Sequence, residues 1–191
     1  MKRCAFLSTD NLEDFFVYDD LVTPHLQALD WSVEDVSWHN KTVDFNQFDM
    51  VVVRSTWDYQ AHPGAFQEVL ETIEASNAVL QNPLALLQWN FSKRYLRDLE
   101  AKRIPILPTL WLEEFDSAAI LNAYKHFDCA ELIIKPWVSA NADFTYRLSQ
   151  EAFLFEQQSI KQSLASRPIM LQAFEKSILD KGEYSLFYFS G

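Results

Sequence analysis

The chain has 191 residues and a formal net charge of −11, and 49% of its residues are hydrophobic and 15% aromatic. This length corresponds to one or two domains, and the apolar content is enough for a packed core, which excludes a disordered chain. The negative charge argues against nucleic acids and anionic membrane surfaces as partners. A local group of cations must therefore hold any anionic ligand.

Two cysteines, Cys4 and Cys129, lie far apart and match no metal-binding or redox spacing. This pattern fits a reducing compartment, and we expect the cytoplasm. No stretch approaches the length of a membrane span, and the apolar run after the basic N-terminus is too short for a signal peptide. With only three glycines, the chain has neither a Walker-type loop nor a GxGxxG dinucleotide loop.

The first half of the chain has the pattern of an open α/β sheet, in which strands and helices alternate. The apolar run at 48–53 is typical of a central parallel strand. The helix that begins at Pro63 carries an apolar stripe of Phe66, Val69, Leu70 and Ile73. The expected elements are strands at 2–8, 31–37, 48–53 and 78–80, and helices at 20–29 and from Pro63 onward.

The loop after the third strand gathers several chemical groups at the edge where open α/β sheets bind ligands. It contains a cation, two hydroxyls, a carboxylate and two aromatic rings, from Arg54, Ser55, Thr56, Trp57, Asp58 and Tyr59. One interpretation is an ordinary strand-to-helix loop in which Asp58 or Ser55 caps the helix. The other is a functional loop, because loops at that edge of a sheet often carry binding groups.

Residues 89–102 are expected to form one helix, with Asn90 as its N-cap. Lys93 and Arg94 then fall in the first turn, where the helix dipole is positive, at a cost of about 0.3–1 kcal/mol for each exposed charge. A bound anion would reverse the sign of this effect. A surface helix that tolerates the cost is the alternative.

The run Leu132-Ile133-Ile134 is expected to be a buried strand, followed by a tip at 139–143 and a second strand at 144–148. Side chains alternate along a strand, so Lys135 shares a face with Ile133. The lysine either protects a sheet edge against aggregation or faces an anion. Further elements are expected as strands at 104–109, 169–174 and 184–189 and helices at 113–126 and 149–165.

Taken together, these segments resemble the ATP-grasp proteins of the glutathione synthetase-like, carboxylate–amine ligase type. Residues 89–93 resemble the segment with the first ATP-binding lysine, and residues 133–136 the strand with the second. Residues 170–175 resemble the hinge strand that pairs with adenine, and 182–185 the segment whose glutamate binds ribose. The resemblance implies nucleotide contacts at Lys93, Lys135, Ser139, Asn141, Gln172, Ala173, Phe174, Glu175 and Glu183, and substrate contacts at Arg54, Ser55, Trp57, Asp58 and Tyr59.

The implied fold is an N-terminal open parallel α/β (pre-ATP-grasp) domain followed by an incomplete ATP-grasp domain with a small α+β lid lobe. The expected boundaries are 1–85 for the N-terminal domain, 86–127 for linker helices and a strand, 128–175 for the small lobe, and 176–191 for the start of a truncated C-terminal lobe.

The implied activity is that of an ATP-dependent carboxylate–amine or carboxylate–thiol ligase that acts through an acyl phosphate. ATP and Mg²⁺ are the expected cofactors, and small-molecule carboxylates and amines the expected partners, with a homodimer left open. The family's magnesium ligands lie on later strands, which places them beyond Gly191. No catalytic or metal residue is therefore assigned in this chain, which we expect to be inactive alone. A non-catalytic nucleotide-binding module and an inert fragment are the alternatives.

Overall fold

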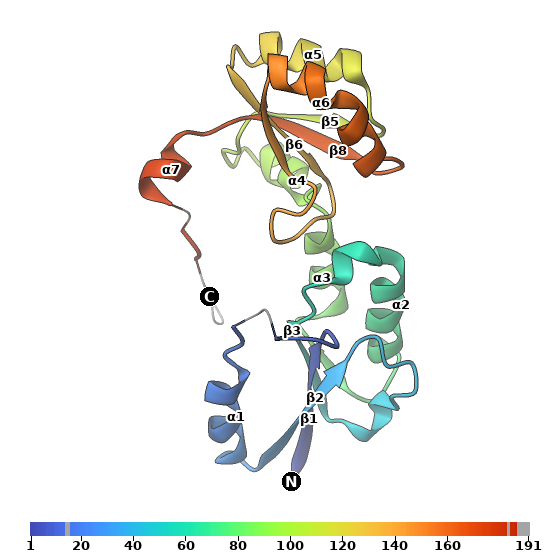
Figure 1. Ribbon diagram of the computed structural model, residues 1–191. Helices are drawn as coiled ribbons and strands as arrows, with labels where there is room; N and C mark the ends of the chain where they lie inside the picture. The colour runs from blue at the N-terminus through green and yellow to red at the C-terminus, as the bar shows by residue number, and fades with distance from the viewer. Residues whose placement is uncertain (14–15, 183, 187–191) are drawn as a thin grey trace. The chain divides into compact units, whose positions relative to one another are not determined.

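The computed structural model describes residues 1–13, 16–182 and 184–186. The chain forms two compact units (Figure 1). The first unit contains Met1–Ala101 and Val138–Asn141, and the second contains Lys102–Trp137 and the residues from Ala142 onward. Across the described residues, no helix is both long enough and apolar enough to cross a membrane.

The sheet of the first unit has four parallel strands in the order β2-β1-β3-β4. These strands are β1 (Lys2–Ser8), β2 (Trp31–Ser37), β3 (Met50–Ser55) and β4 (Val79–Gln81). The expected parallel strands are thus confirmed, and β3 lies between two others. It begins after Asp49, whose side chain accepts a hydrogen bond from the Arg3 N–H at 2.7 Å.

Helices pack on this sheet with the predicted stripe of α2 (Pro63–Glu74) against it. All four residues of the stripe are buried, and they join a core with Leu7, Trp38 and Val51. The predicted helix near residue 20 is confirmed as α1 (Asp19–Gln27). The two leucines of its predicted stripe are exposed, however, with Leu21 at 65% and Leu29, just past the end of the helix, at 71%. Two short 3₁₀ helices, η1 (Phe45–Gln47) and η2 (Tyr59–Ala61), follow the second and third strands.

The single helix predicted for 89–102 is wrong. The chain instead forms α3 (Leu84–Phe91) and α4 (Tyr95–Ala101). Ser92 has extended backbone angles, φ −111° and ψ 141°, which break the helix. Asn90 consequently lies inside α3 rather than at an N-cap, and Lys93 lies in the turn between the two helices.

The second unit has an antiparallel sheet in the order β5-β8-β6-β7. Its strands are β5 (Thr109–Leu112), β6 (Glu131–Pro136), β7 (Tyr146–Ser149) and β8 (Ile169–Ala173). The predicted hairpin is confirmed as β6–β7. The strand predicted for 104–109 is wrong, because β5 begins only at Thr109. Pro105 and Pro108 have no N–H group to donate to a ladder.

Two helices, α5 (Ser117–His126) and α6 (Gln150–Ser163), cover one face of this sheet (Figure 1). Ile120 of α5 and Phe153 of α6 pack with Leu132 and Ile134 of β6 in the core of the unit. The predicted starts differ from the observed ones because Asp116 and Ser149 cap these helices, accepting hydrogen bonds from backbone N–H groups.

The described part of the C-terminal segment differs from the prediction. A short helix that the sequence analysis missed, α7 (Ser177–Lys181), follows β8, and its C-cap is Gly182, whose φ is +73°. Of the strand predicted for 184–189, residues 184–186 are not in a strand. Residues 187–189 lie outside the described residues.

Two phenylalanines on α6 test the core of the second unit. Phe153 is fully buried and Phe155 is 91% exposed. We predict that Phe153→Ala lowers the free energy of unfolding of this unit by about 3–5 kcal/mol, because it removes packed apolar surface and leaves a cavity. Phe155→Ala should change it by less than about 0.5 kcal/mol. Urea unfolding followed by circular dichroism measures both, and equal losses would contradict the assigned orientation of α6.

Candidate functional site

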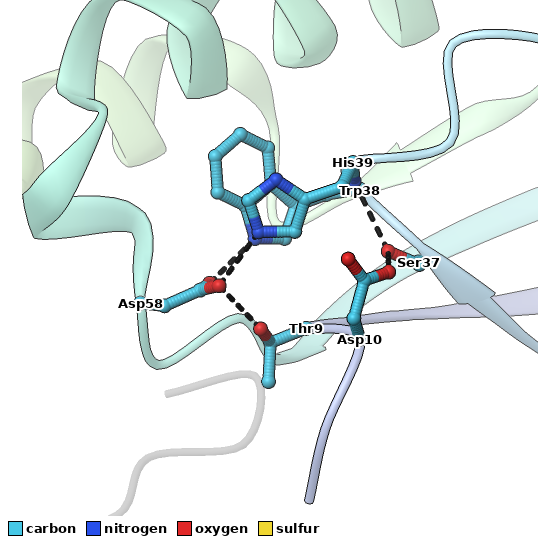
Figure 2. Close-up of polar contacts among 6 residues, drawn as sticks. All are labelled: Thr9, Asp10, Ser37, Trp38, His39 and Asp58. Carbon is cyan, nitrogen blue, oxygen red and sulfur yellow. Dashed lines mark hydrogen bonds and ion pairs between the residues drawn. The ribbon is translucent and has the colours of Figure 1, made fainter.

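The carboxyl ends of three parallel strands bring polar side chains to Asp58 (Figure 2). Thr9 follows β1, Trp38 and His39 follow β2, and Asp58 lies in the loop after β3. Because β1 pairs with both β2 and β3 in parallel, the three strands end at the same edge of the sheet. Side chains distant in sequence therefore meet here.

Both oxygens of the Asp58 carboxylate accept hydrogen bonds. The Trp38 indole N–H donates to Oδ1 at 2.7 Å, and His39 Nε2 lies 2.6 Å from Oδ2. The Thr9 hydroxyl also donates to Oδ2. The His39 ring lies 3.7 Å from the Trp38 ring, centroid to centroid. Asp58 thereby fixes the orientation of the imidazole and the indole at this edge.

The electrostatics of the cluster favour an ionised Asp58. Burial by itself raises the pKa of the Asp58 carboxyl, but the hydrogen bonds from Thr9, His39 and Trp38 outweigh it. The pKa of Asp58 is therefore lowered from its ordinary value.

A second hydrogen-bond chain joins the loops after β1 and β2. The Ser37 hydroxyl donates to Asp10 Oδ1, and the backbone N–H of His39 donates to Ser37 Oγ at 3.1 Å. Sequence reasoning missed Thr9, Asp10, Ser37, Trp38 and His39. Their position at the ends of predicted parallel strands was the signal that could have identified them.

Of the predicted substrate residues, only Asp58 belongs to this cluster. Arg54 Nε donates to Asp19 Oδ1 at 2.6 Å, so its charge is compensated within the protein. Ser55 is buried, and its carbonyl accepts the Thr9 N–H at 2.9 Å. Tyr59 packs into the core, where burial raises the pKa of its phenol. Trp57 is half-buried.

Two predicted nucleotide residues of the second unit, Lys135 and Gln172, lie on the face of the sheet without helices. Lys135 is opposite Met170, and Ile133 is opposite Gln172, so Lys135 and Gln172 share this face. Gln172 is buried and donates to the Thr109 hydroxyl at 2.9 Å. The prediction that Lys135 shares a face with Ile133 is confirmed.

At the end of β8, the pairing with β5 stops at Gln172, whereas the pairing with β6 continues to Ala173. The Phe174 N–H donates to the Glu131 carbonyl of β6 at 3.0 Å. Backbone groups alternate in direction along a strand, so those of Ala173 point toward β5. The residue that would continue β5 opposite Ala173 is Pro108, which has no N–H to donate. Glu175 instead accepts the Ser177 N–H, at 3.0 Å.

Arg147, which sequence reasoning missed, lies beside this strand end. Its guanidinium lies 3.6 Å from the centre of the Phe174 ring and makes two hydrogen bonds to Glu131, of 2.9 and 2.7 Å. The hydrogen bonding by Arg147 lowers the pKa of the Glu131 carboxyl. Phe174 is thus covered by a fixed planar cation.

Two predicted nucleotide residues meet in the first unit. The Lys93 ammonium donates to the carbonyl and to the hydroxyl of Ser139, both at 2.7 Å. Asn141, two residues further, is exposed and has a φ of +51°. Lys135 belongs to the second unit, so its convergence with Lys93 on one triphosphate stays a prediction. Glu183 lies outside the described residues.

The described residues contain no group of three or more His, Cys, Asp or Glu side chains arranged to hold a metal ion.

Comparison with known sequences gives two matches. Residues 4–82 match the family described as the N-terminal domain of D-cycloserine synthetase DcsG. The chain is also 26% identical over 166 residues to the cycloserine biosynthesis protein DcsG of Streptomyces lavendulae, covering 84% of this chain and 54% of that protein. The chain thus spans about half the length of this curated relative.

Comparison with solved structures shows the fold. The crystal structure of D-cycloserine synthetase DcsG aligns with a TM-score of 0.81 at 22% identity, over 94% of this chain and 62% of that chain. A RimK domain ATP-grasp protein of Sphaerobacter thermophilus and D-alanyl-alanine synthetase A of Vibrio cholerae both align with TM-scores of 0.69 at 15% identity, over 91% of this chain and 64% and 60% of theirs. The predicted ATP-grasp resemblance and fold class are confirmed.

The Asp58 cluster gives a pH-dependent prediction. We expect Asp58→Asn to destabilise the first unit by about 1 kcal/mol at pH 7, since the partly exposed carboxylate loses charge-assisted hydrogen bonds. The folded-state pKa is lowered, so this contribution is complete above the unfolded pKa of about 3.9 and is lost as pH falls through the folded value. Urea unfolding between pH 3 and 7 should show the difference from wild type shrinking below about pH 4.

The exposed Glu68 of α2 provides a control in the same unit. Glu68→Gln makes the same carboxylate-to-amide change outside the cluster and should have little effect at any pH. A loss for Asp58→Asn that stays constant down to pH 3 would rule out the ionised carboxylate as its cause.

Proposed function

We propose that this chain is the ATP-binding part of an ATP-dependent carboxylate–amine or carboxylate–thiol ligase. The proposal is supported by the ATP-grasp fold and by the similarity to DcsG. The observation that carries it is the helix-free face of the second sheet. There, the Lys135 ammonium and the open backbone edge at Ala173 lie on neighbouring strands.

These groups fit a nucleotide. The Lys135 ammonium suits a phosphate group as a point charge. The Ala173 carbonyl, which Pro108 leaves without a ladder partner on that side, suits the amino group of adenine. We further propose that Lys93, Ser139 and Asn141 contact the phosphates, that Gln172, Phe174 and Glu175 line the adenine and ribose site, and that Glu183 binds the ribose hydroxyls.

The reaction that we propose for the whole protein is phosphoryl transfer from ATP to a substrate carboxylate, followed by attack of an amine or thiol on the acyl phosphate. Bound ATP and Mg²⁺ supply the phosphoryl group and the charge that neutralises it. The residues of this chain would hold and orient the nucleotide, and the magnesium ligands are proposed to lie beyond Gly191.

We place the small-molecule substrate at the carboxyl edge of the first sheet, near Asp58 and the loop from Arg54 to Tyr59. Two relatives are named for D-cycloserine and D-alanyl-alanine, so a small compound with an amine is the proposed substrate class. Both cysteines are free, which agrees with the proposed cytoplasmic location. A homodimer remains a proposal.

Replacing the two lysines tests the nucleotide site. We predict that Lys135→Gln and Lys93→Gln each weaken ATP binding about 10- to 100-fold, because each removes a charge-assisted contact to phosphate. Isothermal titration calorimetry measures the affinity. Lys125→Gln, at an exposed position on α5, makes the same change away from the site and should leave ATP binding unaltered. Unchanged affinity in both lysine variants would refute the nucleotide site.

Turnover is a separate test. We predict that this chain, mixed with Mg²⁺-ATP and small amino acids, releases no phosphate above background in a coupled assay, although it binds ATP. Phosphate release that disappears in Lys135→Gln would contradict the proposed inactivity. ATP binding by the whole protein without any turnover would favour a non-catalytic nucleotide-binding module.

A further inference from the structure

The imidazole ring of His39 has one nitrogen bound within the protein and one open to a ligand. Nε2 lies 2.6 Å from Asp58 Oδ2 (Figure 2). An ionised carboxylate can only accept a hydrogen bond, so in a neutral imidazole this contact places the proton on Nε2. Nδ1 then carries a lone pair, and the described part of the chain makes no hydrogen bond to it. His39 thus offers a hydrogen-bond acceptor at the carboxyl edge of the first sheet.

The direction of this acceptor is fixed before any ligand binds. The Trp38 ring lies against the imidazole at an interplanar angle of 33°, and the His62 ring meets it edge-on at 6.5 Å between centroids. The backbone N–H of His39 donates to Ser37 Oγ. Rotation of the ring would break the contact with Asp58, so binding requires little further ordering. The His39 side chain is also 29% exposed, which leaves it accessible from solution.

Asp10 supplies a second acceptor on the neighbouring loop. Its Oδ1 accepts the Ser37 hydroxyl, and the same Ser37 oxygen accepts the His39 N–H, so Ser37 joins the two loops (Figure 2). Among the described residues, Asp10 Oδ2 has no hydrogen-bond partner. An ammonium group has only N–H donors and suits acceptors of both kinds, whereas a carboxylate ligand would meet an acceptor at each position.

The charges of the surrounding loops also favour a cation. The loops that follow β1, β2 and β3, at 9–13, 38–42 and 56–62, contain three carboxylates and one ammonium group, from Asp10, Glu13, Asp58 and Lys41. The Lys41 ammonium lies 5.7 Å from the centre of the Trp38 ring. Arg54 of β3 is already paired with Asp19. A ligand ammonium therefore compensates excess negative charge at this edge, and a ligand carboxylate would increase it.

We propose that Nδ1 of His39 accepts a hydrogen bond from the amino group of the substrate, and that Asp58 is a positioning residue that holds the proton on Nε2. The inference rests on the proposed function, which places a small compound with an amine at this edge, and it adds the atom that binds the amine. The alternative is that His39 only ties the loop after β2 to Asp58. The two roles are separable, because the tie does not use Nδ1.

Three small amides test the preference for an amino group. Alaninamide carries an ammonium group, lactamide has a hydroxyl in its place, and propionamide has neither. The Trp38 indole N–H, whose ring contacts His39, reports binding in ¹H–¹⁵N spectra of the chain. We expect saturable shifts with alaninamide and at least about tenfold weaker binding of the other two, which lack a charge-assisted hydrogen bond. Equal affinities for alaninamide and lactamide would overturn the proposal.

His39→Gln separates amine binding from the tie to Asp58. The glutamine amide N–H can take the place of Nε2–H, but no glutamine atom occupies the position of Nδ1. We expect alaninamide affinity to fall about tenfold, which corresponds to one lost hydrogen bond, while the circular dichroism spectrum is unchanged. His25→Gln, at an exposed position on α1, makes the same change elsewhere and should leave the affinity unaltered. Wild-type affinity in His39→Gln would show that His39 is only a structural tie.

The tautomer of His39 is a readout that a purely structural role would not link to binding. Long-range ¹H–¹⁵N spectra show which ring nitrogen carries the proton, and we expect Nε2 in wild type. In Asp58→Asn an amide N–H faces Nε2, so the proton should move to Nδ1. Alaninamide affinity should then fall about as far as in His39→Gln. A wild-type proton on Nδ1, or wild-type affinity in Asp58→Asn, would contradict the assigned acceptor.

ATP titration of the same samples keeps this inference apart from the proposed function. We expect the ATP affinity of His39→Gln to equal that of wild type. ATP binding without any alaninamide binding would overturn the amine site and leave the nucleotide site intact. Alaninamide binding that depends on His39, in a chain that does not bind ATP, would support the amine site and refute the nucleotide site.

Discussion

The Asp58 carboxylate is the constraint that organises the functional edge of the first sheet. It receives hydrogen bonds from Thr9, Trp38 and His39, which follow two different strands, while Asp58 itself follows a third. The strand order β2-β1-β3-β4 places this meeting point where the chain changes direction across the sheet. Open parallel sheets bind ligands at this kind of position. One ionised side chain thus sets the relative positions of three loops.

The local spacing of apolar residues predicted most of the helices and strands, and the wrong predictions have identifiable causes. The stripe of α2 and the parallel strands were predictable because burial on one or both faces leaves a clear periodicity. The helix predicted for 89–102 was wrong because its apolar spacing continues through Ser92, whose backbone is extended. The strand predicted for 104–109 was wrong because two prolines, Pro105 and Pro108, interrupt its apolar residues and cannot donate to a ladder.

Candidate site residues could be predicted only from local features, such as polar and charged side chains directly after a predicted strand. The loop after β3 was singled out in this way, whereas Lys135, inside β6, was singled out by the alternation of side chains along the strand. The partners of Asp58 were missed because they lie 49, 20 and 19 residues away in sequence. Arg147 was missed because its contacts with Glu131 and Phe174 depend on strand register. Register between distant segments is a property of the folded sheet, and no local spacing encodes it.

The Arg54–Asp19 pair has a consequence for anion recognition. The Asp19 side chain is only 12% exposed, and it already occupies the guanidinium. A carboxylate ligand from solution must displace the Asp19 carboxylate from Arg54 and leave Asp19 poorly solvated. Its net binding free energy is therefore only the difference between two similar ion pairs. In this chain, whose net charge is −11, the pairing with Asp19 prevents Arg54 from binding anions non-specifically. Only a ligand that also contacts other groups of the protein would replace Asp19 at Arg54.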